Sequence, residues 1–263
     1  MRPRLPSAAK ALVALGAGAG RAGAAARAVL AALPGPWALP PVPARCAVCG
    51  AWPAQPVCEA CVARFAQPRL RCRTCALPVA AGVVRCGGCL REDPVLARCH
   101  AAVDYGYPWR GIVAEFKFRG WPGWAASLAL LMRSAPWVEP ALEEADWVLP
   151  MPLAPGRLAQ RGFNQSLLLA RRLAPRKADP GLLLRLRETA PQAALARAER
   201  AANVRGAFAA EPLRAAQLRG RRIVLVDDVM TSGASMSAAA TALREAGALA
   251  VDGLVFARTP QPL

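Results

Sequence analysis

The feature that most constrains the fold of this chain is residues 223–235, with the sequence Ile-Val-Leu-Val-Asp-Asp-Val-Met-Thr-Ser-Gly-Ala-Ser. Its four leading apolar residues, mostly β-branched, are typical of a strand that is buried on both faces of a parallel sheet. The pattern breaks at Asp227 and Asp228, which the sequence places directly after the strand. Residues 236–245 then have the pattern of a helix that ends at Gly247. The stretch therefore predicts a strand, an acidic pair, a small-residue turn and a helix.

The small-residue turn is suited to binding an anion. Glycine tolerates unusual dihedral angles and the hydroxyl groups add donors, so several N–H groups can converge on one phosphate at the helix N-terminus. This predicted cradle consists of Thr231, Ser232, Gly233, Ala234 and Ser235.

The rest of the C-terminal part of the chain has the pattern of an α/β domain. We expect strands at residues 101–107, 147–151 and 250–257, and helices at residues 112–116, 124–133 and 167–172. The last strand follows the helix at 236–245, so the two strands around that helix should be parallel with a right-handed crossover. Residues 185–208 are rich in Arg and weakly periodic, which predicts an irregular excursion with a short helix.

A second group of candidate ligands follows the strand expected at 147–151, where residues 152–157 read as a loop. Arginine forks and side-chain amides are suited to phosphate oxygens, although the same residues are compatible with a solvated helix face. The group consists of Arg157, Arg161, Asn164 and Gln165. Lys117 lies near the end of an earlier helix, where a cation is also favoured by the helix dipole alone.

Eight of the nine cysteines form four C-x-x-C pairs, a spacing typical of metal chelation. Two pairs complete a closed site of four thiolates, so the sequence predicts two structural zinc ions. The simplest grouping is sequential, and an interleaved one stays open; redox dithiols and iron–sulfur ligation are the alternatives. The sequential groups are Cys46, Cys49, Cys58 and Cys61, and Cys72, Cys75, Cys86 and Cys89.

The chain has 34 basic against 17 acidic residues, for a formal charge of +17. Such a charge favours polyanionic partners, although an Arg-rich composition alone also explains it, and aromatic residues are sparse. No apolar run reaches the roughly 18 residues that a spanning helix needs. Residues 1–20 resemble a crude signal peptide, but their apolar part is poor in Leu and runs into further Arg residues. Because the C-x-x-C pairs suit metal chelation better than disulfides, we expect a reducing compartment and a cytoplasmic protein.

These patterns divide the chain into three parts. We expect an Ala-, Arg- and Pro-rich flexible extension over residues 1–45, with a short helix at 22–33, then a cysteine module over residues 46–95 and an α/β domain over residues 96–263.

Residues 223–235 resemble the phosphoribosyl-pyrophosphate signature of type I phosphoribosyltransferases. Together with the cysteine pairs and residues 116–120, 150–165 and 189–208, they are similar to the ComF family, which includes ComFC-type competence proteins and GntX-like proteins. The similarity covers roughly residues 40–260. It implies a type I phosphoribosyltransferase-like parallel sheet with flanking helices and a small hood, preceded by a small zinc module.

The resemblance also implies roles for the candidate residues. Asp227 and Asp228 would hold the ribose hydroxyls with or through Mg²⁺, and the cradle would wrap the 5′-phosphate. Residues on the pyrophosphate side would be Lys117, Arg157, Arg161, Asn164 and Gln165. The strand near Tyr105 and residues 189–208 would form the hood over a second substrate that the sequence does not identify.

The function that the resemblance implies is binding of phosphoribosyl pyrophosphate with Mg²⁺ in DNA uptake and natural transformation, with single-stranded DNA and DNA-uptake proteins as partners. Phosphoribosyl transfer to an acceptor would be the associated activity. The alternative is a non-enzymatic, zinc-containing competence factor that binds single-stranded DNA or proteins. A phosphoacceptor receiver domain also pairs Asp residues after a strand, but it lacks the cradle.

Overall fold

The fold is described from a computed structural model, which covers residues 44–92, 94–188 and 203–260. The helix expected at residues 22–33, most of the expected extension and residues 189–202 of the expected hood lie outside these ranges. The three-part division of the chain stays a prediction.

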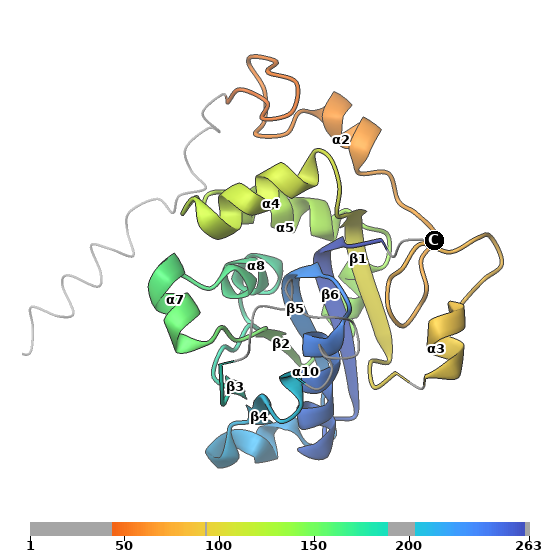
Figure 1. Ribbon diagram of the computed structural model, residues 1–263, viewed down its shortest axis with the longest axis vertical. Coiled ribbons are helices and arrows are strands. Elements are labelled where there is room, and N and C mark those ends of the chain that lie inside the picture. Colours follow the sequence, from red (N-terminus) through yellow and green to blue (C-terminus); the bar gives the residue numbers. More distant parts are fainter. Residues whose placement is uncertain (1–43, 93, 189–202, 261–263) are drawn as a thin grey trace, which may run out of the picture. The chain divides into compact units, whose positions relative to one another are not determined.

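A four-stranded parallel sheet forms the centre of the described chain (Figure 1). The strand order is β1 (Arg98–Asp104), β6 (Ala250–Arg258), β5 (Arg222–Met230) and β2 (Trp147–Pro150). Strand β2 ends with Pro150 opposite Val226, whereas β5 continues beside β6 until Met230 lies opposite Arg258. The predicted parallel α/β sheet is confirmed, and the carboxyl end of β5 extends beyond one of its neighbours.

Two of the expected strands, at 147–151 and 250–257, differ from β2 and β6 by one residue, and the other two differ by more. β1 is shifted towards the N-terminus relative to residues 101–107, because Arg98 already pairs with Asp252 and the chain turns after Asp104. β5 includes the acidic pair that the sequence placed after the strand, because Asp227 keeps its register with Val255 of β6. A strand can continue through a polar pair when a neighbouring strand supplies backbone hydrogen-bond partners.

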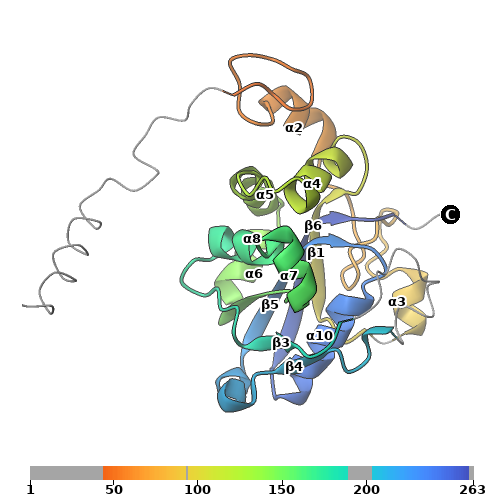
Figure 2. The ribbon, with the colours of Figure 1, turned by 60° about the vertical axis from the view of Figure 1, so that its left-hand side comes forward.

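Helices cover both faces of the sheet, and the alternation of strand side chains divides the core accordingly (Figure 2). Val224 and Val226 pack with four helices, and Ile223 and Leu225 pack on the other face with α10 (Ala234–Glu245). The four helices are α4 (Trp109–Phe118), α5 (Trp124–Arg133), α6 (Val138–Glu144) and α8 (Gln165–Leu173). Helix α5 has the limits that the sequence predicted.

Two short elements replace expected irregular segments. Residues 152–157 were expected to be a loop, but helix α7 (Pro155–Arg161) begins with Pro155 in its first turn, where the missing N–H is no loss, and ends at Gly162. Within 185–208, the described residues contribute to an antiparallel pair, β3 (Leu183–Arg185) with β4 (Phe208–Ala210). This pair packs beside α10 and is followed by the 3₁₀-helix η3 (Pro212–Leu218).

The two cysteine-bearing segments lie in different parts of the fold (Figure 1). The first contains α2 (Glu59–Phe65), and it packs with the core on the α4 side, where Trp109 Nε1 donates to the Phe65 carbonyl at 3.0 Å. The second contains α3 (Gly87–Arg91), and its Ala76 and Leu96 belong to the core on the α10 side. Among the helices of the described ranges, none is long and apolar enough to cross a membrane.

Candidate functional site

The acidic pair at the carboxyl end of β5 is held by groups from two helices. Asp228 is only 4% exposed, and its Oδ1 lies 2.8 Å from Nζ of Lys117 in the last turn of α4. Burial alone would lower the pKa of Lys117, but the carboxylates of Asp228 and Asp227 outweigh it and raise that pKa above its usual value. Lys117 is therefore a charged partner of the pair as well as a cation at a helix end.

Asp227 has a different environment. Its Oδ1 accepts a hydrogen bond from Ser166 Oγ of α8 at 2.8 Å and another from the Asp228 N–H at 2.9 Å. Burial, followed by repulsion from Asp228, raises the pKa of Asp227 to about 7, although Lys117 and Ser166 act in the opposite direction. Two carboxylates beside one ammonium group are electrostatically unfavourable, so a divalent cation or hydroxyl donors would stabilise their charged form.

The predicted cradle lies between the end of β5 and α10. Gly233 is the residue before the helix and has a φ of +86°, a backbone conformation that favours glycine. Ser232 Oγ accepts a hydrogen bond from the Ala234 N–H at 3.3 Å. Helix α10 begins at Ala234 rather than at the expected Met236, so Ala234 and Ser235 lie in its first turn. We call residues 230–233 the phosphate loop; together with this helix N-terminus it forms a local setting suited to an anion.

The predicted pyrophosphate side is built around α7 and the start of α8. Asn164 uses its side chain within the protein, as the cap that accepts from Leu167 N and as a donor to the Met151 carbonyl at 3.0 Å. Gln165 is 1% exposed; it accepts from Arg161 at 3.1 Å and donates to the Lys117 carbonyl at 3.4 Å. The Gln165 amide thus links Arg161 to the end of α4, and the Asn164 amide links the start of α8 to Met151.

Arg157 lies on α7, and its charge contributes to the environment of Arg185 on β3. Burial, followed by the nearby Arg157, lowers the pKa of Arg185, whereas Asp227 and Glu188 act in the opposite direction. Glu188 accepts a hydrogen bond from the Gly156 N–H at 2.9 Å, which ties the segment that follows β3 to the start of α7. Basic groups from α4, α7 and β3 therefore gather near the acidic pair.

Reasoning from the sequence missed three residues of this region: Ser166, Arg185 and Arg258. Ser166 follows Gln165 directly and is 2% exposed. The predicted set of ligands stopped at Gln165 and so left out the next residue. Arg185 was assigned to an irregular segment. Arg258 follows the apolar residues of the last strand, just as Asp227 and Asp228 follow the apolar residues of β5. A polar residue at the carboxyl end of a strand was the sequence signal that could have indicated it.

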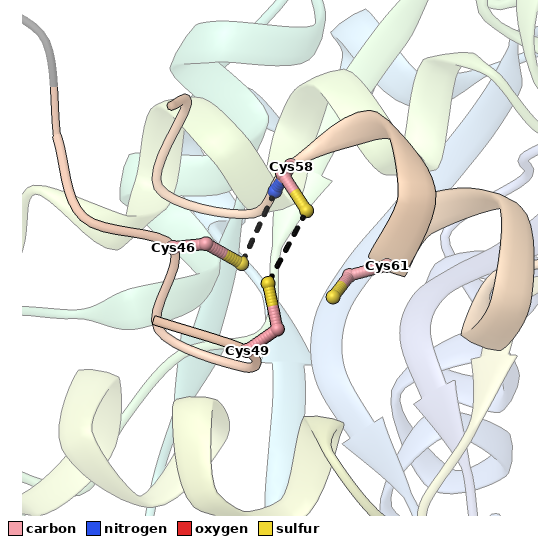
Figure 3. A group of neighbouring side chains, drawn as sticks. All are labelled: Cys46, Cys49, Cys58 and Cys61. Atoms are coloured by element: carbon pink, nitrogen blue, oxygen red, sulfur yellow. Dashed lines mark hydrogen bonds between the residues drawn. The ribbon is translucent and has the colours of Figure 1, made fainter. Parts of the chain in front are cut away.

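The cysteines form two groups of four in which the sulfur atoms lie within 4.8 Å of one another. In the first group the four side chains point towards one another (Figure 3), and the Cys58 N–H donates to Cys46 Sγ at 3.3 Å. In the second, the Cys86 N–H donates to Cys72 Sγ at 3.3 Å. We call them the first cluster (Cys46, Cys49, Cys58, Cys61) and the second cluster (Cys72, Cys75, Cys86, Cys89).

Each cluster fits a tetrahedral metal site. Four thiolate ligands that converge on one point, with backbone N–H groups directed at sulfur, match closed structural sites. Burial raises the pKa of Cys46, but N–H donors from Cys49 and Cys58 outweigh it and lower the value to about 6. The same balance, with Thr74 as the main donor, lowers the pKa of Cys72 to about 6. The sequential grouping is thus the one that the fold brings together, and each group could hold a metal ion.

Comparison with known proteins identifies the C-terminal part of the chain. Residues 166–262 match the family described as "Phosphoribosyl transferase domain". A solved structure titled "Structure of the allosteric regulatory enzyme of purine biosynthesis" aligns over 52% of this chain and 25% of that one, with 23% identity. Its TM-score of 0.32 is too low to carry an argument.

Similarity to curated proteins extends further along the chain. The DNA utilization protein YhgH of Salmonella typhimurium is 32% identical over 209 residues, which are 77% of this chain and 90% of that protein. The YhgH protein of Escherichia coli is 30% identical over 214 residues, with the same two coverages. Competence protein F of Haemophilus influenzae is 29% identical over 170 residues, 62% of this chain and 73% of that protein. The chain therefore belongs to the ComF family, whose members here include YhgH and competence protein F, and it carries a phosphoribosyltransferase domain.

Proposed function

We propose that the carboxyl edge of the sheet binds phosphoribosyl pyrophosphate together with Mg²⁺. The observation that carries this proposal is the acidic pair, which lies near the end of β5, only a few residues before the phosphate loop that follows this strand. A ligand with sugar hydroxyls at one end and a phosphate at the other would satisfy both groups at once. The matched phosphoribosyltransferase domain, which spans this strand and loop, supports the same ligand.

In this proposal each candidate has a role that follows from its chemistry. The carboxylates of Asp227 and Asp228 accept from the ribose hydroxyls and can hold Mg²⁺, which would supply positive charge to the pyrophosphate. The 5′-phosphate binds the phosphate loop and the first turn of α10. Lys117, Arg157 and Arg161 bind the pyrophosphate side, where Gln165 bonds to Arg161 and to the Lys117 carbonyl, and Asn164 caps α8.

The same arrangement supports transfer of the phosphoribosyl group. In such a transfer the bond from the anomeric carbon to pyrophosphate breaks, an acceptor forms the new bond, and the sugar carries positive charge in between. Asp227 and Asp228 would stabilise that charge, and the basic groups would bind the departing pyrophosphate. The predicted hood, formed by the strand near Tyr105 and residues 189–208, would cover an acceptor that is unidentified; β3 precedes residues 189–208, β4 begins at Phe208, and Arg185 of β3 interacts with Asp227.

Binding is tested by titration calorimetry with phosphoribosyl pyrophosphate and Mg²⁺. We expect the double variant Asp227→Asn, Asp228→Asn to bind at least about tenfold more weakly, a loss of about 1.4 kcal/mol. Asp146→Asn is the control, because it removes a carboxylate just before β2, at the opposite end of the sheet. Equal binding by the parent and the double variant would contradict the proposal.

We propose that both cysteine clusters hold Zn²⁺ with a structural role. Closed sites of four thiolates leave no position for a substrate, and the segments that carry them have few large apolar residues of their own. Thiolates kept for metal binding favour a reducing compartment such as the cytoplasm. Elemental analysis of the purified protein should find two zinc ions per chain; iron, or oxidised cysteine pairs, would contradict this assignment.

We propose a role in DNA utilization or uptake, on the strength of the relatives' names and of the net charge of +17. One surface favours direct contact with single-stranded DNA as a second candidate function. At the end of α4, Phe118 is 72% exposed and Trp121 is 63% exposed, and the Arg161 guanidinium lies 5.1 Å from the Phe118 ring centre. Exposed rings beside arginines are suited to stacking against bases.

Direct DNA contact is tested by the affinity for single-stranded oligonucleotides at several salt concentrations. We expect affinity to fall steeply with salt, and Trp121→Ala to lower it by about tenfold, as loss of one stacked base would. Trp137→Ala is the control, because Trp137 is also exposed, at 48%, and lies at the start of α6. Equal loss in both variants, or binding no tighter than that of an unrelated protein of similar charge, would contradict direct recognition.

A further inference from the structure

The side chain of Arg258, at the end of β6, is buried to an extent that is unusual for arginine. It is 1% exposed and is among the largest fully buried side chains of the described protein. An arginine is rarely buried unless its charge and its donors are satisfied. Its partners therefore identify what the residue does.

The guanidinium joins two segments that are far apart in the sequence. Its Nε donates to the carbonyl of Cys75 in the second cluster at 2.7 Å. One terminal nitrogen donates to the carbonyls of Met230, at 3.0 Å, and of Thr231, both in the phosphate loop. Arg258 therefore holds the turn of the cluster and the backbone of the loop at a set separation, because the planar guanidinium directs its donors in fixed directions.

A cavity lies beside the Arg258 guanidinium. A cavity of about 450 Å³ lies between the second cluster and the phosphate loop, and Cys75, Cys86, Met230, Gly233 and Arg258 are among the residues that line it. The arginine thus lines a cavity that separates part of the cluster from the loop, although Ala76 and Leu96 share the core with Met230. Loss of the link should leave the loop less restrained.

The charge of Arg258 is matched by the cluster in its metal-bound form. Within the described ranges, no carboxylate lies within 4.0 Å of its nitrogen atoms, and its partners are neutral carbonyls. A divalent ion with four thiolates carries a net charge of about −2. A loaded second cluster would therefore provide the buried guanidinium with the opposite charge that the protein itself does not supply.

A second arginine holds the same turn but not the loop. Arg71 donates to the Ala76 carbonyl at 3.1 Å and to Asp104 Oδ1 at 2.8 Å. Ala76 follows Cys75, is fully buried and has a φ of +56°. The turn is thus restrained from two sides, and of these two arginines it is Arg258 that also hydrogen-bonds to the phosphate loop.

We propose that Arg258 is a positioning residue through which metal in the second cluster sets the conformation of the phosphate loop. The metal fixes the turn at Cys75, the turn fixes the guanidinium, and the guanidinium fixes the carbonyls of Met230 and Thr231. Affinity for a phosphate in the loop then depends on the second cluster and not on the first. The dependence of phosphate affinity on the second cluster rests on the phosphate-binding role proposed above.

The loop itself is measured by hydrogen exchange, which needs no ligand. We expect Cys86→Ser, which opens the second cluster, to speed amide exchange at residues 230–236 by about tenfold, while Cys49→Ser, which opens the first, leaves it unchanged. Protection of the β5 interior, such as Val224 and Leu225, reports whether the variants remain folded. Equal exchange of the loop in both variants would overturn the coupling.

The role of Arg258 is separated from that of the turn by two further variants. Arg258→Lys keeps the charge but loses the fork that spans both segments, so loop exchange should rise without loss of zinc. Arg98→Lys serves as the control, because Arg98 pairs with Asp252 and Glu144 at the start of β1 and contacts neither the turn nor the loop. Titration with ribose 5-phosphate should show about tenfold weaker binding in Arg258→Lys and Cys86→Ser than in the controls.

The two levels of the proposal fail in different ways. If the parent does not bind ribose 5-phosphate while loop exchange follows the predicted pattern, the proposed ligand is wrong and the coupling stands. If the parent binds ribose 5-phosphate but Arg258→Lys leaves both affinity and loop exchange unchanged, the coupling through Arg258 is wrong and the phosphate site stands.

Discussion

The pairing of Lys117 with Asp228 allows a sharp test of the site's electrostatics. We expect Lys117→Met to destabilise the protein, because it leaves a carboxylate with 5% side-chain exposure beside a second carboxylate. At 2.8 Å the attraction in an effective dielectric of about 20 amounts to about 6 kcal/mol. Desolvation of both charges offsets much of it, and Lys117 is 20% exposed, so we expect a net loss of about 2–4 kcal/mol.

A double-mutant cycle in urea isolates this pair, since urea adds no ions that would screen it. Asp228→Asn removes the charge that Lys117→Met strands, so the double variant should be more stable than Lys117→Met alone, with a coupling energy of about 1–3 kcal/mol. Lys177→Met is the control, because the Lys177 ammonium group donates to the carbonyls of Leu142 and Glu143 and pairs with no carboxylate among the described residues. A coupling energy below about 0.5 kcal/mol would refute the reasoning.

Three further predictions concern single contacts. The folded-state pKa of Asp227 lies near 7, above its ordinary value of 3.8, so its carboxyl favours folding at low pH and that contribution is lost as pH rises from about 4 to 7. Asp227→Asn should therefore flatten this part of a thermal stability–pH profile and be the more stable protein above pH 7. An unchanged profile would contradict the pKa shift. Gly233→Ala should cost about 1–2 kcal/mol in urea unfolding, because the φ of +86° is strained for alanine while Met230 leaves room for the methyl group; a neutral change would mean that the turn relaxes. Trp109→Phe should cost about 1 kcal/mol through the lost bond to the Phe65 carbonyl, and a urea midpoint equal to that of the parent would show that water replaces the donor.

The fold class and many of its elements could be predicted from local pattern. Helix α5 has the predicted limits because its apolar spacing is regular along its length. The parallel sheet was predictable because a continuous apolar run such as that of β5 is needed only where both faces are buried. The grouping of cysteines was predictable because C-x-x-C spacing lets two thiolates converge within one turn, and neighbouring pairs are the nearest partners.

Other elements depended on partners that are remote in the sequence. Strand β5 continues through Asp227 and Asp228 because β6 supplies hydrogen bonds there, and the antiparallel pair of β3 with β4 forms from segments with weak periodicity of their own. Asn164 and Gln165 have the residue types of phosphate ligands, but the fold uses their amides to cap α8 and to hold Arg161 and the end of α4.

The sequence by itself determined the chemistry of the site: an acidic pair, a small-residue turn at a helix start and two sets of four thiolates are local features, and short-range geometry is enough to create them. Only the tertiary structure decided which of these features are joined. Arg258 and Cys75 lie 183 positions apart, and nothing local relates them. They meet because parallel strands bring their carboxyl ends to one edge of the sheet, where the second cluster packs and where a buried guanidinium must find acceptors.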